Sequence, residues 1–121
     1  MTYDPNNVFA RILRGEIPCK KVMENEHVLA FHDIQPQAPV HVLVIPKGAY
    51  VSMVDFTAKA SPAEQAALMK AVGDVARQQG VAETGYRVIS NCGADGHQDV
   101  PHLHLHVLGG RKLGRMIGKA E

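Results

Sequence analysis

The sequence has 121 residues, of which 45% are hydrophobic and 21% are charged, and its formal net charge is +1. This length fits a single domain, residues 1–121, that buries its own hydrophobic core. The near-neutral charge, with no Lys or Arg run longer than two residues, argues against long nucleic acids but leaves a single nucleotide open as a ligand.

Cysteine usage and the absence of long apolar runs indicate the compartment. Cys19 and Cys92 form no CxxC pair and are typical of free thiols in a reducing environment. The N-terminal residues 1–16 lack the apolar core of a signal peptide, and the apolar run VLVIP at 42–46 is too short to span a bilayer. We therefore expect a cytoplasmic protein that makes no contact with a membrane.

The first predicted element is a short helix that ends at Arg14. Asn6 or Asn7 can cap its N-terminus, and Gly15 stops it. Residues 16–26 are predicted to be extended and turn-like.

Two strand-like segments follow. Residues 27–34 have strand composition, and the loop after them is stiffened by Pro36 and Pro39. Residues 41–46 are almost continuously apolar, so we expect a strand that is buried on both faces.

The clearest element is a long helix. Ser61 suits the N-cap, Pro62 suits the first helical position and Glu64 completes a capping box. Apolar residues follow at helical spacing until Gly80 ends the helix.

The last part of the chain is predicted to contain two strands. Residues 85–90 form the first, and a polar loop, NCGADGHQD at 91–99, leads to the second at 100–110. The order helix, strands, helix, strands indicates an α+β domain with a mostly antiparallel sheet.

The second of these strands, VPHLHLHVLGG, carries histidines at alternate positions: His102, His104 and His106. A period of two is the period of a β-strand, so the histidines share one face and the leucines pack on the other. Gly109 and Gly110 end the strand.

Metal binding is one interpretation of this face. Side chains two positions apart on a strand are separated by roughly 6.5–7 Å, whereas zinc binds nitrogen at about 2 Å. A site would need a further ligand such as His41, Cys92 or Asp99, and we expect no metal.

Two other interpretations remain. A neutral imidazole is a good nucleophile toward phosphorus, and the glycines at 93 and 96 would let backbone N–H groups hold phosphate oxygens. Alternatively, the histidine row is a structural or partner-binding patch that responds to pH.

The motif HLHLHVL, with apolar residues between and after the histidines, is identified as that of the histidine triad (HIT) superfamily. FARILRGEIPCKKV, LAFHDIQPQAPVHVLVIPK, GYRVISN and HLHLHVLGGR resemble its Hint branch, the histidine triad nucleotide-binding proteins, from about Val8 to Arg111. The resemblance implies a five-stranded antiparallel sheet with two helices, and a homodimer that joins two sheets into one of ten strands. It also implies a purine nucleotide ligand, AMP or GMP, and hydrolysis of a phosphoramidate or acyl-nucleotide through a covalent nucleotidyl-histidine, without a cofactor.

The resemblance also implies a role for individual residues. His104 matches the nucleophile, His106 a phosphate contact, His102 a supporting member, His41 a fourth histidine that polarises the triad, and Asp33 the carboxylate that holds the ribose hydroxyls. The walls of the base pocket match Phe9, Ile12, Phe31, His32 and Ile34, of which Phe9 and Ile12 suit the core equally well. The phosphate-side contacts match Asn91, His97, Gln98 and Asp99.

Two positions depart from the family pattern. Asp99 stands where many relatives carry a serine that helps to protonate the leaving group, and a carboxylate there would repel a phosphate unless it points away or is protonated. His97 stands where glycine is common and would narrow the leaving-group side. Two alternatives to phosphoramidate hydrolysis stay open: a Fhit-like hydrolase of dinucleoside polyphosphates, which shares the triad but is disfavoured by the Hint-like segment HDIQPQAPVH, and a nucleotide-binding or scaffolding protein with only residual turnover.

Overall fold

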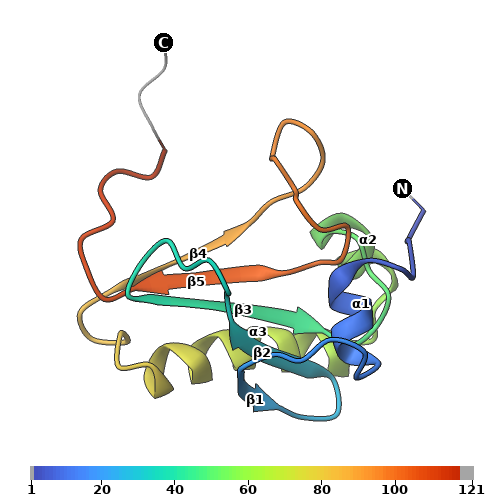
Figure 1. Cartoon of the computed structure of the whole chain (residues 1–121), viewed down its shortest axis with the longest axis horizontal. Helices are drawn as coiled ribbons and strands as arrows, with labels where there is room; N and C mark the ends of the chain where they lie inside the picture. Colours follow the sequence, from blue (N-terminus) through green and yellow to red (C-terminus); the bar gives the residue numbers. More distant parts are fainter. Residues whose placement is uncertain (1, 118–121) are drawn as a thin grey trace.

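A computed structural model describes residues 2–117 of the chain as one antiparallel sheet with three helices (Figure 1). The strands lie in the order β1-β2-β3-β5-β4. Their bounds are β1 Lys21–Glu24, β2 Val28–His32, β3 Val40–Pro46, β4 Tyr86–Ser90 and β5 Leu105–Gly109. The helices are α1 Val8–Leu13, α2 Met53–Lys59 and α3 Pro62–Gln78. This confirms the α+β class and the five-stranded antiparallel sheet.

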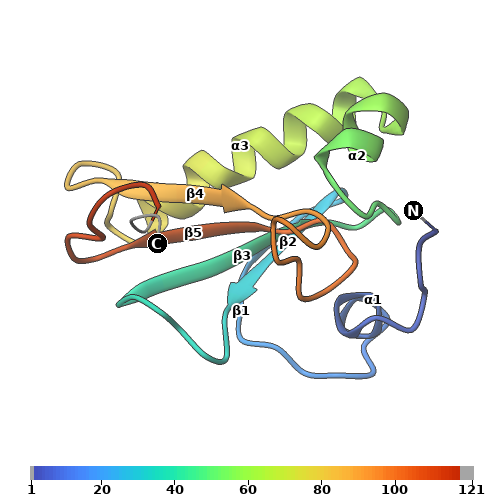
Figure 2. The same ribbon diagram turned by 90° about the horizontal axis from the view of Figure 1, so that it is seen from above.

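The sheet has a helix layer on each face (Figure 2). α2 and α3 lie on one face, and the shorter α1 lies on the other. Alternation along β2 and β3 creates two hydrophobic clusters, because Val42 and Val44 pack on the α3 side whereas Leu43 and Ile45 pack on the α1 side. β3 is therefore buried on both faces, as its continuous apolar sequence predicts.

The helix ends follow the predicted capping. Ser61 Oγ accepts a hydrogen bond from the Glu64 N–H at 3.1 Å, and the Glu64 carboxylate accepts one from the Ser61 N–H at 3.0 Å. Asn7 caps α1 by accepting from the Ala10 N–H at 2.9 Å. Gly15 then ends α1 with a φ of 79°, in the left-handed region that glycine tolerates best.

The structure corrects the expected number of helices. α2 is a third helix, and it begins with a capping box in which Asp55 accepts a hydrogen bond from the Ser52 N–H at 2.6 Å. α2 has only seven residues, of which Phe56 alone is buried. It therefore lacks the long series of apolar residues at helical spacing that identifies α3.

The histidine strand is also shorter than predicted. β5 begins at Leu105, so His104 precedes the ladder, and His102 lies in a bend, where its N–H donates to the Val100 carbonyl at 2.8 Å. β3 ends its pairing with β5 at Val44, and the Leu103 N–H instead donates to the Tyr50 carbonyl at 2.8 Å. Within residues 2–117, no helix is long and apolar enough to cross a membrane.

Candidate active site

The alternation of histidines and leucines divides the segment 102–107 between the two faces of the sheet. Leu103, Leu105 and Val107 belong to the core cluster under α3. His106 is paired with Leu43 of β3 and shares its face, on the α1 side. The predicted sidedness is therefore confirmed even where the regular ladder is absent.

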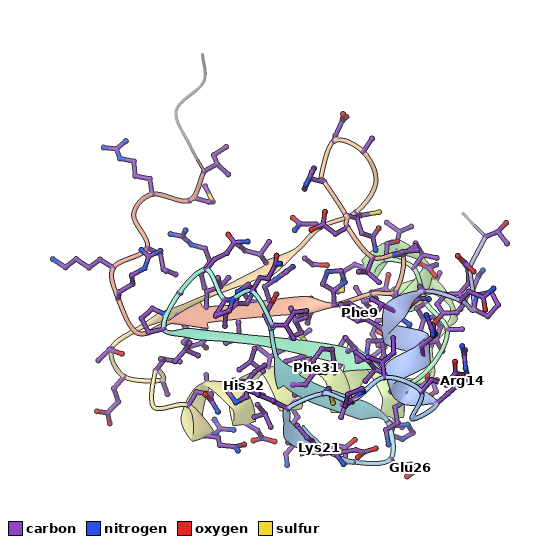
Figure 3. The ribbon with its side chains drawn as sticks, in the orientation of Figure 1. Phe9, Arg14, Lys21, Glu26, Phe31 and His32 are labelled. Carbon is purple, nitrogen blue, oxygen red and sulfur yellow. The ribbon has the colours of Figure 1, made fainter. Side chains whose placement is uncertain are left out.

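A pocket of about 250 Å³ lies on this face, between α1, the end of β2 and the chain around the histidines. Phe9 of α1 and Phe31 of β2 pack together in its wall in a T-shaped arrangement, with ring centroids 5.6 Å apart (Figure 3). The lining residues are Val8, Phe9, Ile12, Ile17, Pro18, Cys19, Phe31, His32, Asp33, Ile34, Leu43, Asp99, Val100, His104 and His106. The walls are thus mainly apolar, with a few polar groups at one end, as in many small-molecule sites.

A larger cavity, of about 670 Å³, lies elsewhere, beside β4 and the chain that follows β5. It is lined by residues such as Arg87, Arg111 and Lys112 and by no histidine within the described chain. We place the candidate site in the smaller pocket because that pocket contains the groups able to do chemistry.

His104 presents an unprotonated nitrogen to this pocket. Its Nδ1 lies 2.7 Å from the carbonyl oxygen of His102, which can only accept, so Nδ1 carries the proton and Nε2 keeps its lone pair. Burial lowers the pKa of His104 below the ordinary value, which keeps the ring neutral. The edge of the Phe9 ring packs against it, with centroids 4.9 Å apart. The ring is therefore held with a free lone pair on Nε2.

His106 presents a protonated nitrogen, and His41 determines this. The backbone N–H of Gln37 donates to Nδ1 of His41 at 3.0 Å, so His41 carries its proton on Nε2. That Nε2 lies 2.9 Å from Nδ1 of His106, which therefore accepts and leaves its own Nε2–H as a donor. Burial lowers the pKa of His41, and burial together with His104 and His41 lowers the pKa of His106 to about 4.

His102 is fully buried and does not line the pocket. Its Nε2 donates to the Pro46 carbonyl at 2.8 Å, so its Nδ1 accepts a hydrogen bond, at 2.6 Å, from the hydroxyl of Tyr3. Burial lowers the pKa of His102 as well. The backbone carbonyl of His102 accepts the hydrogen bond that orients the ring of His104.

The structure brings most of the predicted residues together. Phe9, Ile12, Phe31, His32 and Asp33 line the pocket, and Ile34 lies at its rim with 92% of its surface exposed. Asp33 also lies 3.4 Å from Nε2 of His41, at the edge of the histidine network.

The predicted phosphate-side residues are more scattered. Of the four, Asp99 lines the pocket, whereas Asn91, His97 and Gln98 lie outside the described lining. The amide of Gln98 turns inward and donates to the Val51 carbonyl at 2.7 Å and the Val100 carbonyl at 3.0 Å. His97 adopts a left-handed backbone with a φ of 55° and lies 3.3 Å from the Asp99 carboxylate.

Several site residues have no sequence signal that identified them. Val8, Ile17, Pro18, Leu43 and Val100 complete the apolar wall, and any of them suits an ordinary core. Cys19 also lines the pocket, and both it and Cys92 are free thiols, as expected. Tyr3 contacts His102 from 99 positions away along the chain, a separation no local pattern reveals.

One group of side chains bears on metal binding. Ligand atoms of Asp33, His41 and His106 all lie within 4.8 Å of one another. These three residues come from the end of β2, from β3 and from β5, and the combination includes His41, a candidate further ligand, together with Asp33, which is remote from the histidine strand in sequence. The absence of a metal in the working enzyme therefore stays a prediction.

Comparison with known proteins places this geometry in a family. The HIT domain family matches residues 14–113. An uncharacterised 13.2 kDa HIT-like protein of Azospirillum brasilense is 72% identical over 98% of this chain and 97% of its own length. A purine nucleoside phosphoramidase of Escherichia coli is 42% identical over 91% of this chain and 92% of its own length.

Solved structures agree. A HIT family hydrolase from Legionella pneumophila superposes with a TM-score of 0.86, at 39% identity over 93% of this chain and all of that one. A HIT family hydrolase from Clostridium thermocellum superposes with a TM-score of 0.83, at 43% identity over 93% of this chain and 96% of that one. The match over most of the chain, with the histidine face in place, shows that the chain belongs to the HIT family of hydrolases.

Proposed function

We propose that the protein hydrolyses purine nucleoside 5′-phosphoramidates, or the corresponding acyl-nucleotides, through a covalent nucleotidyl-His104 intermediate. One observation carries the proposal: in the same pocket, His104 offers an unprotonated Nε2 and His106 offers an Nε2–H. A nucleophile beside a hydrogen-bond donor suits attack on phosphorus with a phosphate oxygen held in place. The 42% identity to a phosphoramidase supports the same reaction.

The pocket offers a place for each part of a nucleotide such as AMP or GMP. The rings of Phe9 and Phe31, with Ile12, provide apolar walls for a purine. The Asp33 carboxylate, at the end of β2, can accept hydrogen bonds from both ribose hydroxyls. The phosphate then lies at the histidine end, against the Nε2–H of His106.

The proposed reaction has two displacements. The Nε2 lone pair of His104 forms a bond to phosphorus while the P–N bond breaks, and the leaving nitrogen takes the bonding pair and one proton from solvent. Water then attacks the phosphorus and gives one proton back to solvent, and His104 leaves with its lone pair restored. An acyl-nucleotide would release a carboxylate in the first step. The covalent route replaces one difficult displacement with two easier ones.

Two further properties belong to the proposal. The exposed edge of β4 suits the joining of two sheets in a homodimer, since Tyr86 and Val88 are 45% and 41% exposed there. The free thiols of Cys19 and Cys92 suit the cytoplasm.

The deciding experiment compares substrates under one set of conditions. We expect kcat/KM for an adenosine phosphoramidate to exceed that for a diadenosine polyphosphate by at least about a hundredfold, equivalent to about 3 kcal/mol in transition-state binding. A preference for the polyphosphate would support the Fhit-like alternative. Tight AMP binding with negligible turnover of both substrates would support the binding-protein alternative.

A further inference from the structure

The proposed nucleophile lies in a part of the chain that the sheet does not hold. The pairing of β5 with β3 and β4 ends at Leu105, so His104 and the bend at His102 lie outside the ladder. The ring of His104 is oriented instead by the backbone carbonyl of His102, which lies 2.7 Å from its Nδ1. The direction of the His104 ring therefore depends on what holds residue 102 in place.

Each polar group of His102 has a partner. Its backbone N–H donates to the Val100 carbonyl at 2.8 Å, and its carbonyl accepts from His104. In its ring, Nε2 donates to the Pro46 carbonyl at 2.8 Å, and Nδ1 accepts from the Tyr3 hydroxyl at 2.6 Å. Because His102 is 0% exposed, a partner lost from this set leaves a buried polar group without a hydrogen bond. The Tyr3 hydroxyl thus completes the set of bonds that fixes the ring.

Two aromatic rings enclose the imidazole of His102. Tyr3 meets it edge-on, with ring centroids 5.5 Å apart, and Phe9 does so at 6.3 Å. Phe9 also packs against the ring of His104, with centroids 4.9 Å apart. The imidazoles of His102 and His104 therefore share an aromatic neighbour, and a rotation of the first ring would disturb the packing of the second.

The segment that carries Tyr3 is anchored to α1. The Asp4 carbonyl accepts hydrogen bonds from the Asn7 backbone N–H at 3.2 Å and from the Asn7 side-chain amide at 2.7 Å. The Arg14 guanidinium, at the other end of the helix, donates to the Pro5 carbonyl at 2.7 Å. Tyr3 is therefore presented to His102 by a fixed turn.

We propose that Tyr3 is a positioning residue for the nucleophile: its hydroxyl fixes the ring of His102, and the carbonyl of His102 in turn fixes the attacking ring of His104. The inference rests on the proposed attack by His104. Neither Tyr3 nor His102 lines the pocket, so the effect of Tyr3 belongs to the rate of the first displacement and not to the affinity for the nucleotide. Attack on phosphorus needs an aligned nitrogen, so a small tilt of the His104 ring lowers that rate steeply.

The first measurement compares the wild type with Tyr3→Phe at a temperature where both are folded. We expect the single-turnover rate of nucleotidyl transfer from an adenosine phosphoramidate to fall about tenfold, as a small misplacement implies. The Kd for AMP should change by less than about twofold, since the pocket lining is unaltered. Tyr3→4-aminophenylalanine keeps an N–H donor at the same position and should restore most of the rate.

The second measurement follows the Nδ1–H of His104 by NMR in protein that contains isotope-labelled histidine. Exchange of this proton with solvent reports how often its bond to the His102 carbonyl opens. We expect exchange to be about tenfold faster in Tyr3→Phe. In Tyr3→4-aminophenylalanine it should stay near the wild-type value.

Two control variants separate positioning from a general loss of stability. Ser61→Ala removes the oxygen that caps α3, on the face of the sheet opposite α1 (Figure 2), and lowers stability without contacting the histidines. Tyr86→Phe removes a hydroxyl at an exposed site on β4. Both variants should keep the wild-type rates of nucleotidyl transfer and of proton exchange.

The outcomes separate this inference from the proposed function. Absence of nucleotidyl transfer in the wild type would contradict the proposed function. Transfer by the wild type, with transfer and exchange rates in Tyr3→Phe that differ from it by less than about twofold, would overturn the role of Tyr3 alone. Equal changes in Ser61→Ala, or a Tyr3→4-aminophenylalanine variant as slow as Tyr3→Phe, would overturn it as well.

Discussion

His41 stands directly behind His106, with Nε2 of His41 2.9 Å from Nδ1 of His106. Because the Gln37 N–H fixes the other nitrogen of His41 as an acceptor, one backbone group determines the tautomer of both rings. This arrangement depends on neutral imidazoles, since protonation of Nδ1 of His106 would place two N–H groups face to face. The proposed activity therefore depends on conditions that keep the network uncharged.

The first prediction concerns pH. The folded-state pKa of His106 is about 4, below the value of about 6.5 in an unfolded chain. The unfolded state thus binds more protons between these values, and the free energy of unfolding should decrease as pH falls from about 6.5 to about 4. Denaturant unfolding across this range measures it, and His106→Gln should reduce the slope. An identical slope in the variant would contradict the assignment.

The second prediction concerns the nucleophile. His104→Ala should lower kcat by about a thousandfold or more, because the attacking nitrogen is lost, while AMP binding measured by calorimetry changes little. His27→Ala is the control, because His27 lies in the turn between β1 and β2 and does not line the pocket. Retention of more than about a tenth of wild-type turnover would exclude His104 as the nucleophile.

The third prediction concerns Tyr3. Tyr3→Phe removes the hydroxyl that donates to the buried Nδ1 of His102. An unsatisfied buried acceptor costs about 1–3 kcal/mol, so thermal or denaturant unfolding should show a loss within that range. Tyr86→Phe, at an exposed site on β4, should cost much less. Equal stability of the two variants would show that the Tyr3 contact contributes nothing.

The fourth prediction concerns metals. Treatment with EDTA should leave turnover unchanged, because the proposed attack uses the free lone pair of His104. Added zinc should inhibit, since Asp33, His41 and His106 can supply three ligand atoms and the ion would displace the proton between the two histidines. Loss of activity on chelation, with recovery on zinc addition, would require a metal-dependent mechanism instead.

The fifth prediction concerns assembly. Sedimentation at micromolar concentration should show a dimer, and Val88→Lys should shift it toward monomer by placing a charge on the exposed edge strand β4. Val54→Lys introduces the same charge on α2, where Val54 is 77% exposed, and should leave the dimer intact. A wild-type monomer would remove the dimer from the proposal.

Local patterns were sufficient for much of the fold. The alternation at 102–107 gave the correct face for His106 and Leu105, although not the start of the strand, because that start depends on where the pairing of β5 with β3 and β4 ends, at Val44 and Ser90. The helix α2 has a recognisable signal in retrospect, since Ser52 and Asp55 have capping-box spacing. Residues 53–59 have no long series of apolar residues at helical spacing to accompany that capping signal.

The sequence motifs indicate which residues lie near the pocket but not the direction in which each side chain points. Phe31 and Asp33, which the family resemblance assigns to the base and ribose sites, both line the pocket. It did not reveal that Gln98 turns inward, because its amide bonds to Val51, which is distant in sequence. The tautomers of the histidines could not be predicted from the sequence either, because they depend on backbone carbonyl and N–H groups of Pro46, His102 and Gln37.

The division of residues 102–107 between two faces has an evolutionary consequence. The apolar side chains anchor the segment beneath α3, while His104 and His106 face the pocket, so substitutions at these two positions would remove the proposed chemistry with a limited effect on folding. Descendants of such a chain could keep the same fold and bind a ligand without catalysing a reaction. Insertions would be tolerated in the loop 91–100 but not within 102–107, where one added residue would exchange the two faces.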